Sequence, residues 1–229
     1  MSDFIAKFQL NFIKGDRWKL LLDGLGVTLE VTFFAVILGI ILGFLVAVIR
    51  AAHDKTGGLK ILNAIAKIYT TVVRGTPTLV QLLIIYYVLF SSVNIDKVFV
   101  AVIAFGLNSG AYVSEIVRSG IMSVDEGQFE AGRSLGFSYG KTMWYIVLPQ
   151  AFKNILPALG NEFITLLKET SISSYIALGD LTKAGDIIRS RTYYAFMPLI
   201  AVALIYLLMV FIFTKLLAML ERRLRNSEQ

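Results

Sequence analysis

The chain contains no cysteine, and its one histidine is His53. Without cysteine it can form no disulfide, no thiolate metal site and no cysteine nucleophile. A single histidine cannot complete a metal site or a catalytic triad. We therefore expect His53, which lies beside Asp54 in a polar turn, to be a solvated side chain without a chemical role.

Charged residues are also scarce. They make up 17% of the 229 residues, and hydrophobic residues make up 56%. Soluble domains have about 25% charged and about 45–50% apolar residues. The apolar residues here are gathered in long blocks, and a helix needs about 20 of them to cross a bilayer. These features exclude a soluble enzyme and a disordered chain, and they predict an all-α integral membrane protein.

The net charge of +6 does not indicate a nucleic-acid partner. No basic stripe interleaved with aromatic residues is present, so we expect no nucleic-acid binding. An excess of Lys and Arg is instead typical of the cytoplasmic loops of membrane proteins. The beginning of the chain lacks a basic-then-apolar opening with a small-residue cleavage site, so no removable signal peptide is expected.

The apolar blocks predict five transmembrane helices in a single domain, residues 1–229, at about 27–49, 61–90, 98–117, 156–178 and 194–220. The second block contains Pro77, and we expect a kink there. In the first block the small residues recur at every fourth position, namely Ala35, Gly39, Gly43 and Ala47. This spacing predicts one face on which another helix can approach closely.

Five spans place the two termini on opposite sides of the membrane. The side that holds the loop 118–155 carries thirteen Lys and Arg residues, and the other side carries eight. Since positive residues accumulate in the cytoplasm, this predicts an outside N-terminus and a cytoplasmic C-terminus.

The loop 118–155 is predicted to form a helical hairpin. Ser123 and Glu126 have the spacing of a capping box, which predicts a helix start. Gly136 is placed where a helix would end. A second short helix around residues 139–147 should end before Pro149.

The same loop carries a family pattern. Glu130-Ala131-Gly132, followed by Gly136 and then by Ile146-Val147-Leu148-Pro149, resembles the EAA loop of ABC importer permeases, with Gly132 in place of the second alanine. The resemblance implies a coupling helix that docks into a cleft of an ATP-hydrolysing subunit. We expect its small residues to fit closely into the groove of that partner. The residues predicted to couple to the ATPase are Glu130, Ala131, Gly132, Leu135, Gly136, Phe137, Leu148 and Pro149.

Four further segments are similar to permeases for polar amino acids, and together they cover about residues 20–220. They are Arg74-Gly75-Thr76-Pro77, residues 108–118, Gly127-Gln128 and Leu167-Lys168-Glu169-Thr170-Ser171. The resemblance implies a type I ABC importer permease in a bacterial inner membrane. It also implies ATPase subunits, a second permease subunit (identical or closely related) and an extracytoplasmic amino-acid-binding protein.

The chain itself is not expected to hydrolyse ATP. Gly136, Gly140, Lys141 and Thr142 look like a phosphate-binding loop, but one residue is missing between the glycines and no strand precedes them. We therefore expect a transport subunit with no bound cofactor, and ATP and Mg²⁺ on the partner ATPase.

Ionisable and polar side chains within the predicted spans are candidates for substrate binding, because they are costly in a membrane. Asn108 and the serine and threonine residues could instead form interhelical hydrogen bonds. The acids favour a cationic substrate such as arginine, lysine or histidine, with glutamine or another neutral polar amino acid as the alternative. The predicted substrate-binding residues are Glu30, Asn108, Ser109, Glu169, Thr170, Ser171 and Ser173.

Two other acids have structural interpretations. Glu115 is expected to pair with Arg118 one helical turn away. Glu162 is expected near the cytoplasmic headgroups, where it would orient the loop.

Two other classes of protein compete with this interpretation. An ion-coupled secondary carrier could use Glu30 and Glu169, but such carriers usually contain internal repeats, and none is evident here. A membrane scaffold would leave the acids within the spans without a role.

Overall fold

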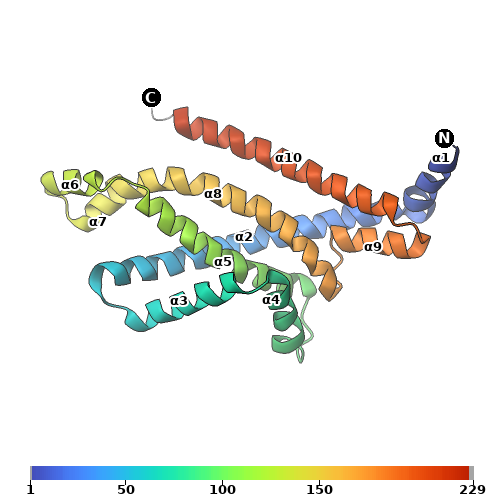
Figure 1. Ribbon diagram of the computed structural model, residues 1–229, viewed down its shortest axis with the longest axis horizontal. Helices are drawn as coiled ribbons and strands as arrows, with labels where there is room; N and C mark the ends of the chain where they lie inside the picture. The colour runs from blue at the N-terminus through green and yellow to red at the C-terminus, as the bar shows by residue number, and fades with distance from the viewer. Residues whose placement is uncertain (1, 227–229) are drawn as a thin grey trace.

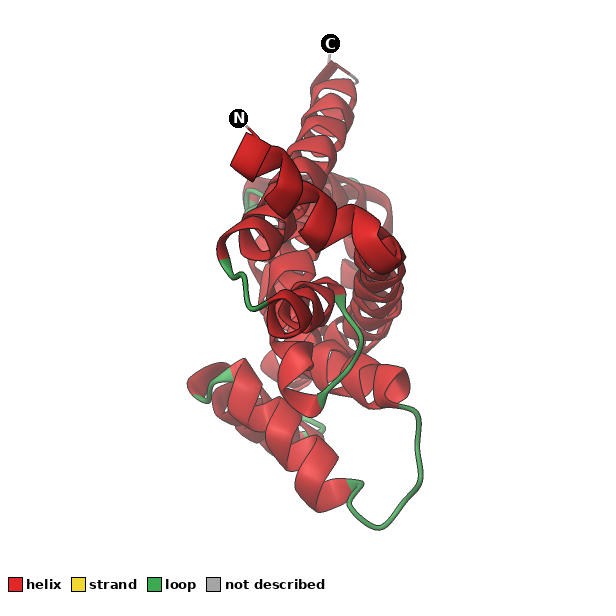
Figure 2. Ribbon diagram, turned by 90° about the vertical axis from the view of Figure 1, so that its right-hand side faces the viewer, coloured by secondary structure: helices red, strands yellow, loops and turns green. Residues whose placement is uncertain are grey.

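The computed structural model describes residues 2–226, apart from the side chains of residues 2, 55, 56 and 224–226. This part of the chain is helical and has no strand; its helices are joined by short links (Figures 1 and 2). The α-helices are α1 (Ser2–Phe8), α2 (Arg17–Thr56), α3 (Lys60–Gly75), α4 (Thr78–Ile84), α5 (Lys97–Met122), α6 (Gly127–Ser134), α7 (Tyr139–Thr142), α8 (Leu148–Glu169), α9 (Leu181–Thr192) and α10 (Phe196–Asn226). Short 3₁₀ turns lie at Lys14–Asp16 and Thr170–Ile176, and π turns at Gln9–Ile13, Ile85–Leu89 and Met143–Val147.

Helices α2 and α5 pack closely, in parallel, and form the centre of the molecule. A Cβ atom at Gly39 would lie 2.8 Å from the Ser109 side chain, and one at Gly43 would lie 2.5 Å from Val113. Ala35 and Ala47 on the same face are buried. The prediction that these small residues admit another helix is confirmed, because a larger side chain at Gly39 or Gly43 would force the two backbones apart.

Helix α8 runs antiparallel to α5. Helix α10 packs against another side of α8. A Cβ atom at Gly120 of α5 would lie 2.3 Å from the Ile155 side chain of α8. The rings of Phe163 and Phe213 meet edge to face, 4.8 Å between centroids, where α8 crosses α10. The hairpin of α6 and α7 therefore projects from one end of the bundle, while α1 and α9 lie at the other end (Figure 1).

Helices α3 and α4 form a bent pair. Their axes differ by 111° across a break between Gly75 and Thr78. Thr76 and Pro77 both have extended backbone conformations there. The predicted kink near Pro77 is thus a full break, since proline excludes the helical conformation of the residue before it.

By length and composition, three helices of the described residues could cross a membrane, or four if the bent pair forms one span. Helix α8 has 22 residues, but it carries charged and amide side chains, including Asn161, Glu162 and Lys168. The count of five spans therefore stays a prediction.

Two local predictions for the loop are wrong. Ser123 does not begin a helix, because it still has helical backbone angles at the end of α5, and its hydroxyl donates to the Gly120 carbonyl. Helix α6 begins at Gly127, whose N–H donates to the Asp125 carboxylate. The second short helix also does not end before Pro149. The π turn continues into α8, whose first turn accepts proline because its N–H groups need no intrahelical partner.

Candidate functional site

A cleft of about 620 Å³ lies between α5 and α8, on the side that leads towards the hairpin. Its wall is completed by the last turn of α3. The lining residues are Arg74, Tyr112, Glu115, Ile116, Ser119, Gly120, Ser123, Asn154, Ala158 and Glu162. The cleft thus combines an arginine and two carboxylates with small and amide side chains.

Glu162 lies at the inner end of this cleft and faces α5. The buried Ser109 hydroxyl donates to the Glu162 carboxylate over 2.9 Å. Among the described residues, Glu162 has no ion-pair partner. Its expected position near the cytoplasmic headgroups stays a prediction. Helix α8 begins at Leu148, so Glu162 lies about 21 Å along it.

The second carboxylate of the cleft, Glu115, is surrounded by arginines. Arg50 of α2 forms the closest ion pair with it. Arg74 and Arg118 each approach it to 3.9 Å. The predicted local pair with Arg118 is present, but Arg50 is the nearer partner. The charge of Glu115 is therefore balanced within the chain, whereas that of Glu162 is not.

Gln81, which the sequence analysis missed, connects α4 to the same region of α5. The amide nitrogen of Asn108 donates to the Gln81 carbonyl oxygen over 3.1 Å. Asn108 is only 2% exposed, so it lies behind the cleft wall rather than on it. Gln81 is an uncharged residue in an apolar stretch, and a single amide within a predicted span was the only signal that could have found it.

The other predicted substrate-binding residues are not gathered at the cleft. Glu30 is exposed on α2 and has no partner among the described residues. Glu169 lies on α8 about 10 Å beyond Glu162. The polar residues that follow Glu169 form hydrogen bonds within their own turn or are buried. The Thr170 hydroxyl donates to the Leu167 carbonyl, the Ser171 carbonyl accepts from Ser174, and Ser173 is buried.

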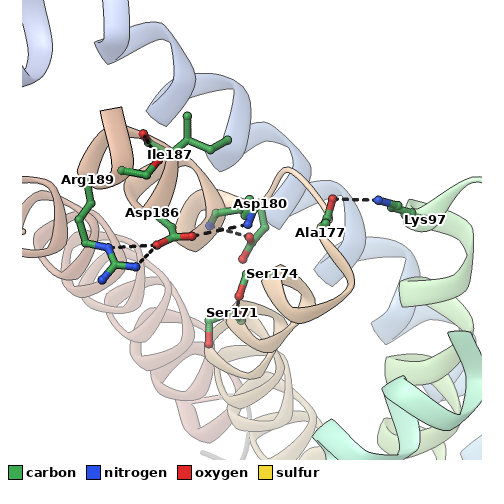
Figure 3. A network of polar contacts seen from close by, with 10 residues as sticks. Lys97, Ser171, Ser174, Ala177, Asp180, Asp186, Ile187 and Arg189 are labelled. Carbon is green, nitrogen blue, oxygen red and sulfur yellow. Dashed lines mark hydrogen bonds and ion pairs between the residues drawn. The ribbon is translucent and has the colours of Figure 1, made fainter. Parts of the chain in front are cut away.

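The opposite end of the molecule carries a separate polar network (Figure 3). Asp180 caps α9 by accepting a hydrogen bond from the Lys183 N–H, and its second carboxylate oxygen is buried without a partner. Burial raises the pKa of Asp180 to about 6, because the hydrogen bonds only partly replace lost water. Nearby, Arg189 holds the pKa of the half-buried Asp186 below its ordinary value through a hydrogen bond of 3.1 Å.

The hairpin at the other end is closed by Gly136. Its φ is +76°, which favours glycine, and the Phe137 N–H donates to the Gly132 carbonyl while the Gly136 N–H donates to that of Arg133. This pattern is a Schellman cap, so the predicted helix end is confirmed. It leaves Leu135 71% exposed and Phe137 37% exposed at the tip.

Gly132 does not have the expected role. A Cβ atom there would lie 2.5 Å from the Thr142 side chain, so the small residue allows α6 and α7 to pack on each other. It is buried inside the hairpin rather than presented to a partner. The other predicted coupling residues lie at the surface of the hairpin or next to it. Six of them are exposed and Leu148 is half-buried; the exposed ones are Glu130, Ala131, Leu135, Gly136, Phe137 and Pro149.

A helical bundle with apolar outer faces, a polar cleft between antiparallel helices and a projecting helical hairpin defines the membrane-spanning subunit of a transporter. The family model described as binding-protein-dependent transport system inner membrane component matches residues 35–226. The chain belongs to this family of ABC importer permeases, and it is a transport subunit rather than an enzyme.

Two curated relatives and a solved structure show the similarity along nearly the whole chain. The arginine transport system permease protein ArtQ of Bacillus subtilis (strain 168) is 42% identical over 210 residues, covering 91% of this chain and 94% of ArtQ. The glutamine transport system permease protein GlnP of Escherichia coli (strain K12) is 36% identical and covers 90% and 93%. The crystal structure of an amino acid ABC transporter with histidines contains a chain that is 47% identical, with a TM-score of 0.83 and coverage of 90% and 94%. The chain is therefore an amino acid ABC transporter permease.

Proposed function

We propose that the permease carries cationic amino acids through the cleft between α5 and α8, with Glu162 facing the positive side chain of the substrate. The observation that carries this proposal is the difference between the two cleft carboxylates. Glu115 is paired with arginines, whereas Glu162 accepts only the Ser109 hydroxyl. A carboxylate without a cation in a cleft favours a cationic guest, since charges within a membrane are usually paired.

Arg74 is suited to the other end of the substrate. It lines the same cleft, and its side chain is 44% exposed. Its guanidinium lies 5.5 Å from the Tyr112 ring centroid and 3.9 Å from Glu115, so it keeps N–H donors for a carboxylate. Guanidinium and carboxylate groups form strong, oriented pairs. An amino acid would then lie with its carboxylate towards Arg74 and its side chain towards Glu162.

The similar proteins support a cationic substrate without deciding it. ArtQ is named for arginine and the 47% identical structure for histidines, but GlnP is named for glutamine. A neutral polar amino acid is therefore the alternative outcome of the test below. An ion-coupled carrier is not favoured by any of them.

The family supports a proposal for the partners and for the orientation of the chain in the membrane. Its members work with an ATPase and a binding protein. We propose that the hairpin docks on the ATPase through Ala131, Leu135 and Phe137, in the cytoplasm, and that the end with α1 and α9 faces outside. A second permease subunit, identical or closely related, would complete the pathway. ATP and Mg²⁺ would be bound by the ATPase alone.

The test is direct binding of radiolabelled arginine and glutamine to the purified permease–ATPase complex. The binding protein is left out, because its own affinity would otherwise dominate the result. Glu162→Gln should weaken arginine binding at least tenfold and glutamine binding less than threefold, because only arginine loses an ion pair. Glu30→Gln and Glu169→Gln are the comparison variants, since both acids lie away from the cleft. Unchanged arginine binding in Glu162→Gln would refute the proposed role of this carboxylate.

A further inference from the structure

We propose that Gln81 is a positioning residue of the transport cleft. Its amide fixes the link between α3 and α4 onto α5 and thereby holds Arg74 opposite Glu162. This inference rests on the proposed function of the cleft, but not on which amino acid is carried.

The break between α3 and α4 leaves backbone groups without helical partners. Thr76 and Pro77 are extended, so the last carbonyl groups of α3 receive no N–H from a following turn. The Gln81 amide nitrogen replaces these donors. It lies 2.7 Å from the Val73 carbonyl oxygen, 3.0 Å from the Thr76 carbonyl oxygen and 2.8 Å from the Thr76 hydroxyl. That hydroxyl itself donates to the Val72 carbonyl over 2.8 Å, which leaves its oxygen free to accept.

The second polar group of the same amide, its carbonyl oxygen, is bound by α5. The Gln81 carbonyl oxygen accepts from buried Asn108, 3.1 Å away. The next residue, Ser109, donates to Glu162 of α8. One side chain thus joins the end of α3, the start of α4 and the point where α5 meets α8.

Arg74 lies between the two backbone positions that Gln81 holds. The contacts of its own side chain are long, at 3.9 Å to Glu115 and 5.5 Å to the Tyr112 ring. Its position in the cleft therefore depends on the backbone of residues 73–76. When the Gln81 hydrogen bonds are removed, this backbone can move, and the separation of Arg74 from Glu162 is no longer fixed. Misplaced groups bind their substrate poorly even when every group is still present.

If the role of Gln81 were only structural, its amide would do no more than satisfy buried polar groups. A matched control variant distinguishes this role from the positioning of the cleft. Asn11 at the opposite end is buried, donates to the Lys7 carbonyl and accepts from Thr192. It joins two segments through one amide, as Gln81 does, but is remote from the cleft. Asn11→Leu should lower the melting temperature and change the Kd for arginine less than twofold.

The experiment measures the Kd of radiolabelled arginine and of glutamine, together with the melting temperature, on the complete permease–ATPase complex. Gln81→Leu should raise the Kd for the bound amino acid about tenfold. Gln81→Glu, which keeps an acceptor but loses the donors, should do the same and serves if Gln81→Leu does not assemble.

The outcomes separate this inference from the proposed function. If Gln81→Leu and Gln81→Glu lower only the melting temperature, as Asn11→Leu does, Gln81 is structural and the inference is overturned. If glutamine proves to be the ligand, the proposed cationic substrate fails, yet a tenfold higher Kd for glutamine in Gln81→Leu would still support the positioning role.

Discussion

Within the hairpin, the identities of Gly132 and Thr142 depend on each other. The family pattern has alanine at the position of Gly132, and here an added Cβ would lie 2.5 Å from both the hydroxyl and the methyl group of Thr142. Thr142 is buried and donates to the Ser138 carbonyl, so it cannot move aside without losing that bond. The departure from the pattern is thus explained by the neighbour that this chain has.

Gly132→Ala should weaken the association of the permease with its ATPase, because α6 and α7 are forced apart. Gly132→Ala with Thr142→Ala should restore association, since the second change removes both clashing atoms. Gly140→Ala is the control, because nothing lies within 4 Å of its Cβ position. The fraction of ATPase retained on the purified permease measures the effect. An equal loss in the single and the double variant would contradict the pairing.

The buried Asp180 makes one region of the fold sensitive to pH. Its pKa is raised from 3.8 to about 6 in the folded protein, so the folded state holds this proton more tightly than the unfolded state. The resulting stability is complete below about pH 4 and is lost as the pH rises through 6. A shift of this size corresponds to about 3 kcal/mol.

Asp180→Asn should therefore stabilise the protein at pH 8 and have little effect at pH 4. Asparagine caps a helix about as well as aspartate, so the cap of α9 is kept. Melting temperatures at the two pH values provide the measurement. A stabilisation that is equal at both would show that the charge of Asp180 is not the cause.

For whole helices, the close contact of α2 with α5 limits the size of the side chains between them. Gly43→Leu should destabilise the permease by roughly 1–3 kcal/mol, because the new side chain overlaps Val113. Gly26→Leu in the same helix should be tolerated, since nothing lies within 4 Å of that Cβ position. Thermal unfolding in detergent compares the two. Equal losses would mean that helix propensity, and not packing, decides.

Much of the helical arrangement could be predicted from residue patterns. The spacing of small residues indicated the packed face of α2, proline indicated the break at Pro77, and Gly136 indicated the end of α6. The beginning of α8 could not be predicted, because a proline such as Pro149 is typical both of the end of a helix and of the first turn of the next one. The contact of Ser109 with Glu162 could not be predicted either, because it depends on how α8 packs against α5.

For the molecule as a whole, the exposed tip of the hairpin is the best place to test docking. Leu135→Asp should abolish binding of the ATPase while leaving the fold intact, since this side chain is 71% exposed. A bulky residue at Gly136 would be a poorer test, because it would also strain a backbone with φ of +76°. Tyr193→Asp, at a 95% exposed position on the opposite end, is the control. Normal ATPase retention and uptake in Leu135→Asp would refute docking through the tip.

Only part of the candidate site could be predicted from the sequence, for a physical reason. Ser109 was found because polar residues in spans are rare. Gln81 and Arg74 act through a break whose geometry depends on tertiary contacts, and no local pattern specifies those. Thr170 and Ser173 were chosen by the same polarity criterion, yet they are buried. Polarity identifies which side chains need partners, but not whether the partner is a substrate or a helix.

Helix α2 has 40 residues and is therefore about 60 Å long, twice the thickness of the bilayer core. Near one end, Gly24 lies against Asp180 and Leu181; near the other, Asp54 lies 3.8 Å from Arg118, beside the hairpin. An uninterrupted helix of this length is expected to move as a rigid body. A tilt of about 10° around its midpoint would displace each end by about 5 Å in opposite directions. A movement at one end of α2 is thus expected to reach the other end through a single rigid element.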